Sequence, residues 1–161
     1  MKKHKRRETI SEIADKYFND IKLYCGDSLR FYSILSNLCN EYFINEIICE
    51  IFNKPEKIID ATRDLGTFTN KLILLDACGI FETQGTLYNN LEELNGIRNI
   101  YAHRLIKEEI PQNVKDKITN LWNQYKKNYS KHKNFTFFEK FKIIEDKTFY
   151  KLISLWMSVK I

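Results

Sequence analysis

Apolar residues recur every three to four positions along most of this chain, which is the periodicity of helices with one buried face. Glycine, proline and short polar runs separate the periodic segments. Residues 134–144 fit either a short helix or an extended segment. The other segments predict helices over residues 9–23, 29–52, 67–78 and 86–105, one that begins at Pro111, and a final one over 146–160.

Residues that favour helix ends support these boundaries. Pro55 closes the second helix because proline cannot continue the hydrogen-bond ladder. Gly79 supplies the positive φ that commonly ends a helix, and a less regular connection covers residues 56–66. Pro111 begins its helix where its missing N–H costs nothing. The expected N-terminal caps are Thr9 or Ser11, Asp27 or Ser28, and Thr67.

The helix over residues 29–52 is the longest, and its apolar residues on several faces suggest a central position. The chain has only two prolines and no internal repeat. We therefore expect one all-α domain over residues 9–161, folded as a helical bundle of about six helices. The apolar stripe expected to be buried on the longest helix consists of Phe31, Ile34, Leu35, Leu38, Tyr42 and Ile48.

The composition is that of a globular protein. The chain has 161 residues, of which 43% are hydrophobic and 14% aromatic, enough for a substantial core. No apolar run approaches the roughly 20 residues that span a bilayer. The charged N-terminus is not followed by the apolar region of a secretory signal. We expect a cytoplasmic protein with no membrane partner.

The formal net charge of +5 is concentrated at one end of the chain. Five basic residues lie within residues 1–8, and the rest of the chain is close to neutral. We expect these residues to form a disordered basic tail with weak, salt-sensitive attraction to phosphate. A second basic cluster at residues 126–133 is more typical of a solvated helix end than of a binding patch.

Four cysteines and three histidines show no metal-binding spacing, so we expect neither a metal nor another cofactor. The cysteines are expected to be reduced core residues, because free cysteine behaves as a small hydrophobe. The four are Cys25, Cys39, Cys49 and Cys78.

The candidate chemistry lies in residues 94–104, LNGIRNIYAHR. On a helical wheel Arg98 falls in the middle of an apolar stripe, whereas Asn99 and His103 lie on roughly the opposite side. A guanidinium keeps its charge, so a buried one needs an anion or hydrogen bonds. Residues three and four positions from Arg98 include no carboxylate, so its partner must come from elsewhere.

Each of these residues also has a purely structural interpretation. Arg98 could pair with an acid on another helix, the usual arrangement for a buried charge. His103 could lie in the last helical turn, where a cation meets the negative end of the helix dipole. Asn99 could cap the helix or form a local hydrogen bond. The spacing alone does not decide between structure and function.

Two levels of resemblance follow from these residues. Residues 98–103, RNIYAH, resemble the R-N-x-x-x-H signature of the HEPN superfamily, helical proteins that include toxin and antiviral ribonucleases. The ordered trio LGTFTNK at 65–71, ACGI at 77–80 and IRNIYAH at 97–103 resembles the mannitol operon repressor family. The trio covers about a quarter of the chain and is more specific than the six-residue signature.

The HEPN resemblance implies a HEPN-like fold and metal-independent RNA cleavage by a homodimer. In that chemistry His103 would move a proton at neutral pH while the ribose 2′-OH attacks the adjacent phosphate. Arg98 would donate hydrogen bonds to the developing negative charge, and Asn99 would fix the imidazole tautomer. The narrower resemblance implies a transcriptional regulator, although no helix-turn-helix motif is recognisable. A protein partner, either an antitoxin or a transcription factor, belongs to the same expectation.

Helical geometry imposes a condition on such a site. Arg98 and His103 differ by about 140° on a straight helix, so their side chains would point apart. A site therefore requires the helix to end near His103 or a second protomer to complete it. Gly96 could allow another backbone to approach closely, or be only a tolerated weak point in the helix.

Two functions of different classes remain open. The first is a HEPN-like endoribonuclease or RNA-binding protein that acts through Arg98, Asn99 and His103. The second is a non-catalytic, mannitol-repressor-like regulator that acts through protein contacts, with the same three residues serving structure. The sequence also leaves open whether the Phe-rich segment 135–141 packs internally or forms an interface.

Overall fold

The computed structural model describes residues 9–26, 28–60, 66–103, 109–129 and 134–160, and every regular element in these ranges is helical. The predicted all-α class is thus confirmed. The basic tail at residues 1–8 lies outside the described ranges. The elements are α1 (Ile10–Cys25), α2 (Leu29–Ile51), α3 (Glu56–Ile59), α4 (Phe68–Ala77), α5 (Leu87–Ala102), α6 (Gln112–Tyr125), the 3₁₀ turn η1 (Lys126–Asn128) and α7 (Phe137–Val159).

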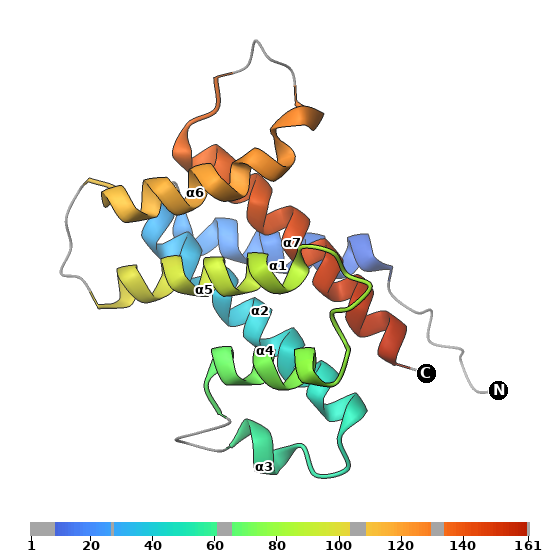
Figure 1. The fold of residues 1–161 in the computed structure, drawn as a ribbon. Helices are drawn as coiled ribbons and strands as arrows, with labels where there is room; N and C mark the ends of the chain where they lie inside the picture. Colours follow the sequence, from blue (N-terminus) through green and yellow to red (C-terminus); the bar gives the residue numbers. More distant parts are fainter. Residues whose placement is uncertain (1–8, 27, 61–65, 104–108, 130–133, 161) are drawn as a thin grey trace.

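The two longest helices, α2 and α7, pack against each other at the centre of the bundle. Helix α1 packs on both of them, and α5 contacts the same pair together with α4 and α6. Figure 1 shows α6 above α5, with α4 and the short α3 below it. This arrangement confirms the central position predicted for the helix over residues 29–52.

Local sequence signals explain most helix boundaries. Thr9 Oγ1 accepts a hydrogen bond from the Glu12 N–H at 3.2 Å, and Ser28 and Thr67 cap α2 and α4 in the same way. Gly79 has φ +77° directly after α4, as predicted. Helix α6 begins at Gln112, one residue later than expected, and Pro111 is its N-terminal cap. The additional helix α3 lies in the connection predicted to be irregular.

The apolar stripe predicted on α2 is fully buried only at Ile48. Phe31, Leu38 and Tyr42 are 56%, 48% and 47% exposed, so the expected stripe faces largely outward. The face toward α7 and α5 instead combines apolar ends with a polar middle. Apolar residues occupy both faces of α2. The helical periodicity therefore favoured the face that no polar residue interrupts, whereas the face that is buried includes polar residues. The buried polar residues of α2 are Ser33, Ser36, Asn37 and Asn40.

The C-terminal segments form one continuous helix, α7, where a break between residues 144 and 146 was expected. A capping box between Thr136 and Glu139 starts this helix. Phe141 is fully buried, and the ring centroid of Phe138 lies 5.6 Å from that of Tyr32. The Phe-rich segment 135–141 therefore packs internally, which answers the question that the sequence left open.

A layer of buried polar side chains, the polar layer, crosses the middle of the bundle. It separates a core cluster around α4 and the C-terminal halves of α2 and α7 from a second cluster around α6 and their N-terminal halves. Glu145 accepts hydrogen bonds from Ser36 Oγ at 2.7 Å and Asn40 Nδ2 at 3.2 Å. The layer consists of Ser36, Asn37 and Asn40 of α2, Asn90 of α5, and Glu145 and Thr148 of α7.

The four cysteines are free thiols, but only Cys25 is buried and Cys39 half-buried. Cys49 and Cys78 are exposed, so the expectation that all four lie in the core was wrong. Cys49 lies about 200° around α2 from the buried Ile47 and so faces away from the core, and Cys78 is the C-terminal cap of α4. Within the described ranges, no helix is both long and apolar enough to cross a bilayer.

Candidate functional site

Helix α5 carries the candidate residues, and its core-facing side is as the wheel predicts. Leu87, Leu91 and Leu94 are fully buried, and Tyr101 is 8% exposed. Leu105, expected on the same face, lies outside the described residues. Contacts with α2, α4, α6 and α7 fix this helix rigidly within the bundle. Any group attached to its C-terminal turn is therefore held by a well-packed scaffold.

Arg98 is partly buried and is held by its neighbour in sequence. Its Nη1 donates a hydrogen bond to Asn99 Oδ1 at 2.9 Å, and its Nε is shielded from solvent without an acceptor. Among the described residues no carboxylate forms an ion pair with Arg98. The structural interpretation in which an acid on another helix neutralises this arginine is thus not supported, and the guanidinium retains unused donors.

Helix α5 ends just before His103. The helix stops at Ala102, short of the predicted end at residue 105, and His103 is the C-terminal cap with φ −98° and ψ 2°. Its backbone N–H donates to the Asn99 carbonyl at 3.3 Å, and its side chain is exposed. The first of the two geometric conditions for a site, a helix end near His103, is met.

The three candidate side chains are only partly brought together. The amide oxygen of Asn99 binds Arg98, whereas the expected bond from Asn99 to the His103 imidazole is absent from the described contacts. Among the described residues, no hydrogen bond joins the side chains of Arg98 and His103. The arrangement offers an oriented cation on the last turns of α5 and an exposed imidazole at its C-terminal cap.

Gly96 allows a close approach, but to a side chain of this same chain. A Cβ at Gly96 would lie 3.3 Å from Lys117 Nζ and 3.4 Å from its Cε. Lys117, on α6, forms an ion pair with Glu93 of α5. The glycine therefore makes room for this α5–α6 contact.

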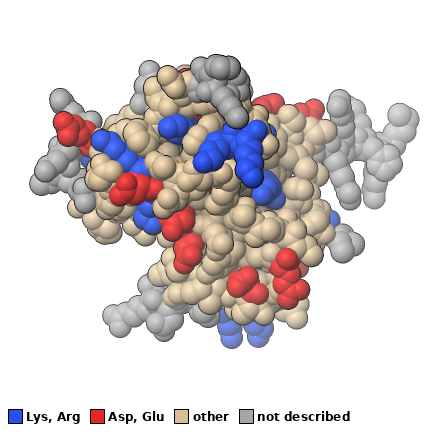
Figure 2. Space-filling model, turned by 45° about the horizontal axis from the view of Figure 1, so that its top comes forward, with Lys and Arg blue, Asp and Glu red and all other residues tan. Residues whose placement is uncertain are grey.

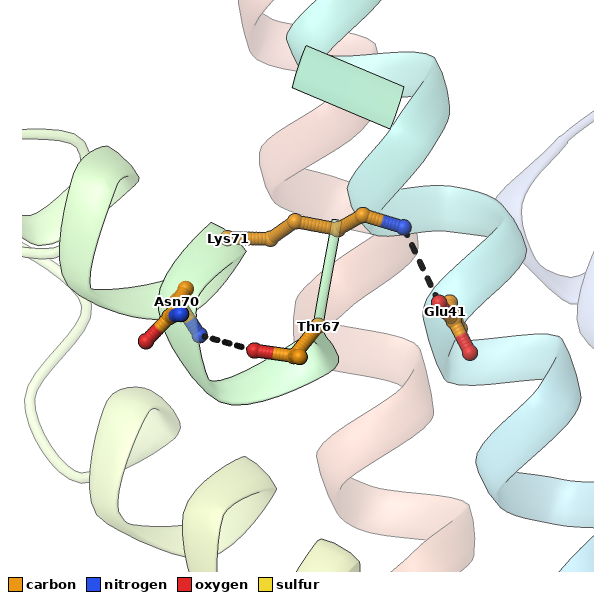
Figure 3. Close-up of polar contacts among 4 residues, drawn as sticks. All are labelled: Glu41, Thr67, Asn70 and Lys71. Carbon is orange, nitrogen blue, oxygen red and sulfur yellow. Dashed lines mark hydrogen bonds and ion pairs between the residues drawn. The ribbon is translucent and has the colours of Figure 1, made fainter. Parts of the chain in front are cut away.

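The helices that carry the resembling stretches contact each other. Asn95 Nδ2 of α5 donates to Thr69 Oγ1 of α4 at 3.3 Å. Two residues further along α4, Lys71 reaches Glu41 of α2 with an Nζ–Oε1 distance of 2.9 Å, and Figure 3 shows this pair beside the Thr67 cap. Position 65, the first of the resembling stretch, lies outside the described residues.

Lys71 is a structurally important residue that the sequence reasoning missed. It is only 2% exposed, an unusual burial for a lysine. A signal existed, since its position is one turn from the apolar positions 68 and 75 on the buried face of α4. A lysine there had to meet an acid from another helix.

Two further carboxyl groups have unusual environments: Glu145 is buried and Asp146 is partly buried. Burial raises the pKa of Glu145 to about 7 and that of Asp146 to about 6. Glu145 is 1% exposed, so no substrate reaches it. The part of the chain that the structure describes holds no group of three His, Cys, Asp or Glu side chains arranged for a metal.

Basic side chains are unevenly distributed over the surface. Figure 2 shows Lys and Arg side chains gathered in the upper half of one face, with some acidic side chains beside those at the left and others at the bottom. Such an imbalance attracts polyanions even when the net charge is small.

No family model, curated protein or solved structure matches this chain.

Proposed function

We propose that this chain is a HEPN-like RNA-binding protein that cleaves RNA without a metal, with Arg98, Asn99 and His103 as the site residues. The observation that carries the proposal is the state of Arg98. Its guanidinium is oriented by Asn99 Oδ1 and is not neutralised by a described carboxylate. A fixed, planar cation of this kind suits a phosphate group.

The chemistry follows from the residue types. His103 would accept the proton of the ribose 2′-OH as that oxygen attacks the adjacent phosphorus. The new 2′-O–P bond replaces the P–O5′ bond, and the departing 5′ oxygen takes up a proton. Arg98 would stabilise the charge on the phosphoryl oxygens. Asn99 would act as a positioning residue, because it holds Arg98 through its side chain and His103 through its backbone carbonyl.

The proposed assembly is a homodimer in which each protomer holds a site of its own. Because α5 ends at Ala102, His103 does not need a second protomer in order to leave the helix. Arg98 and His103 of one protomer can therefore act on the same phosphate once RNA is bound.

The test is RNA cleavage in EDTA by the full chain, with structured and unstructured RNAs. We expect wild-type cleavage, and a loss of about a hundredfold or more in Arg98→Ala and in His103→Ala. A single 2′-deoxy nucleotide at the cleaved position should block the reaction, since it removes the attacking oxygen. Products ending in a cyclic phosphate would identify the mechanism.

Matched controls are present in the chain. Arg30 on α2 is also partly buried and also has a shielded Nε without an acceptor, so Arg30→Ala controls for the loss of such an arginine. Glu92→Ala changes an exposed residue on α5 and controls for substitution on that helix. Both controls should cleave normally. Absence of both cleavage and salt-sensitive RNA binding in the wild type would refute the proposal.

A second function is favoured by a separate observation, the exposed apolar residues Phe31, Leu38 and Tyr42 of α2. A non-catalytic regulator of the mannitol-repressor type would act through protein contacts, and such residues suit a protein partner, an antitoxin or a transcription factor. In that case Arg98→Ala and His103→Ala would change neither RNA cleavage nor RNA binding, because the wild type would show neither.

A further inference from the structure

One face of the molecule, formed by the outer sides of α1 and α2, is unusually apolar; we call it the α1–α2 face. Helix α1 carries Leu23 and Tyr24, which are 77% and 76% exposed, and α2 carries Phe31, Leu38 and Tyr42. These are five of the six large hydrophobic side chains that are most exposed in the described ranges. Scattered exposed apolar residues are common, but this concentration on two neighbouring helices is not.

The face contains a groove between the two helices. Less exposed side chains, among them Tyr17, Ile21, Leu35 and Cys39, line it, and the groove encloses about 280 Å³. Asp20 is the single charged residue in its lining. The protruding Tyr24, near the end of α1, forms part of the rim of this recess. The surface thus has both projecting and recessed apolar parts.

The described chain leaves this face uncovered, and the adjoining basic tail is a poor cover. Residues 1–8, MKKHKRRE, offer a single apolar side chain, Met1. Burying their charged groups against an apolar groove that offers only Asp20 would leave most of them unpaired. Another polypeptide with an apolar surface is better suited than this tail to cover the face.

We propose that a second copy of this chain covers the α1–α2 face in a two-fold symmetric dimer. Two-fold packing requires a patch that is complementary to itself, and a patch with apolar projections beside an apolar recess meets this requirement. In such a dimer each copy would place only one charged residue of its groove lining, Asp20, at the contact, so few charges would have to be buried. Leucine, tyrosine and phenylalanine are suitable side chains for the buried centre of such a contact.

The area is sufficient for a specific contact. The five exposed side chains together present on the order of 600 Å² per protomer, given the surface of large apolar and aromatic residues. Two protomers would then bury about 1,200 Å², the lower end of the range for stable interfaces. The apolar stripe on α2 from Phe31 to Tyr42 extends about 17 Å, enough for three turns of helix to pack against a partner.

This surface is separate from the candidate RNA site. Helix α5 contributes no residue to the groove lining. A dimer through the α1–α2 face therefore leaves Arg98 and His103 open to ligands, and it stands or falls independently of RNA cleavage.

The experiment measures the mass of the full chain by analytical ultracentrifugation. We expect a wild-type dimer, and an increase of about tenfold or more in its dissociation constant for Leu38→Glu. Ile73→Glu is the matched control, because Ile73 on α4 is 51% exposed and lies outside the groove. It should leave the dimer intact. Circular dichroism verifies the fold, and Tyr24→Lys, at an exposed residue of the groove lining, replaces Leu38→Glu if that variant does not fold.

Two results would overturn the inference. One is a wild-type protein that stays monomeric at about 100 μM, a concentration that should populate even a weak interface. The other is a dimer that survives both groove variants but is lost in Ala102→Glu, a substitution of an exposed residue at the end of α5. The second result would place the contact at the motif helix.

Discussion

At the level of single residues, Arg98 shows how a charged group can be held without being neutralised. Its described side-chain hydrogen bond goes to a neutral amide, and both residues are partly exposed. A buried ion pair would make this arginine essential for folding. A single hydrogen bond to Asn99 makes it a small contributor to stability and leaves its charge available for binding.

We therefore predict that Arg98→Ala lowers the free energy of unfolding by only about 1.5 kcal/mol, the lower value for a hydrogen bond that involves a charged group. Urea denaturation followed by circular dichroism measures the difference. Arg98→Met, which keeps most of the aliphatic stem, should cost less still. A loss of about 3 kcal/mol or more would mean that Arg98 satisfies a buried acid and is a structural residue.

Lys71 represents the opposite situation. The lysine side chain is 3% exposed and that of its partner Glu41 is 30% exposed. The buried ammonium therefore needs the ion pair more than the carboxylate does, because water also solvates the carboxylate. Glu41→Ala leaves a buried ammonium without its partner and should destabilise the protein by about 3 kcal/mol. Lys71→Met fills the same space without a charge and leaves Glu41 in contact with water, so it should be close to neutral. Chemical denaturation of the two variants tests this asymmetry, which equal losses would contradict.

At the level of helices, the contact between α2 and α7 depends on a carboxyl group that prefers to be neutral. Burial raises the pKa of Glu145 from 4.5 to about 7, although hydrogen bonds from Ser36 and Asn40 oppose this shift. Burial likewise raises the pKa of Asp146, which follows Glu145 on α7 and accepts a hydrogen bond from Tyr32. Both groups favour the folded state most when they are protonated.

We expect a corresponding loss of stability with rising pH. A carboxyl group whose pKa is higher in the folded state contributes fully below its unfolded value, near 4.5, and this contribution is lost as the pH rises through about 7. For Glu145 the change is on the order of 3 kcal/mol. Glu145→Gln removes this titration, and its amide can donate to Asn40 Oδ1, a buried atom without a donor.

Denaturation midpoints between pH 5 and 8 test the prediction. The wild type should lose stability over this range, while Glu145→Gln should show a flatter profile and be more stable at pH 8. Glu92→Gln, a substitution of an exposed residue, should follow the wild-type profile. Parallel profiles for wild type and Glu145→Gln would show that Glu145 does not control this dependence.

The helices themselves were largely predictable, and the exceptions have clear causes. Strong caps such as Thr67 and a positive-φ glycine at position 79 set boundaries that local sequence determines. The buried face of α2 was predicted only in part because both of its faces are apolar, and the neighbouring helices alone decide which one is covered. The continuity of α7 was missed because a buried glutamate resembles a helix boundary when its partners on α2 are unknown.

At the level of the whole molecule, the candidate site was predictable in its parts but not in its arrangement. The sequence identifies Arg98, Asn99 and His103 and requires a helix end or a second protomer. It does not show where α5 ends or that Asn99 holds Arg98, since these depend on packing and on the local turn. The α1–α2 face was even less accessible to prediction, because its residues look like core residues until the fold leaves them outside.

The polar layer also determines how the central helices align along their axes. Apolar contacts alone would tolerate α7 sliding along α2 by one turn, because one leucine or phenylalanine can take the place of another. The hydrogen bonds of Glu145 with Ser36 and Asn40 exist at one alignment only, and a shift of one turn would place a carboxyl group among apolar side chains. The layer thus fixes the register of the bundle, and with it the position at which α5 presents its C-terminal turn.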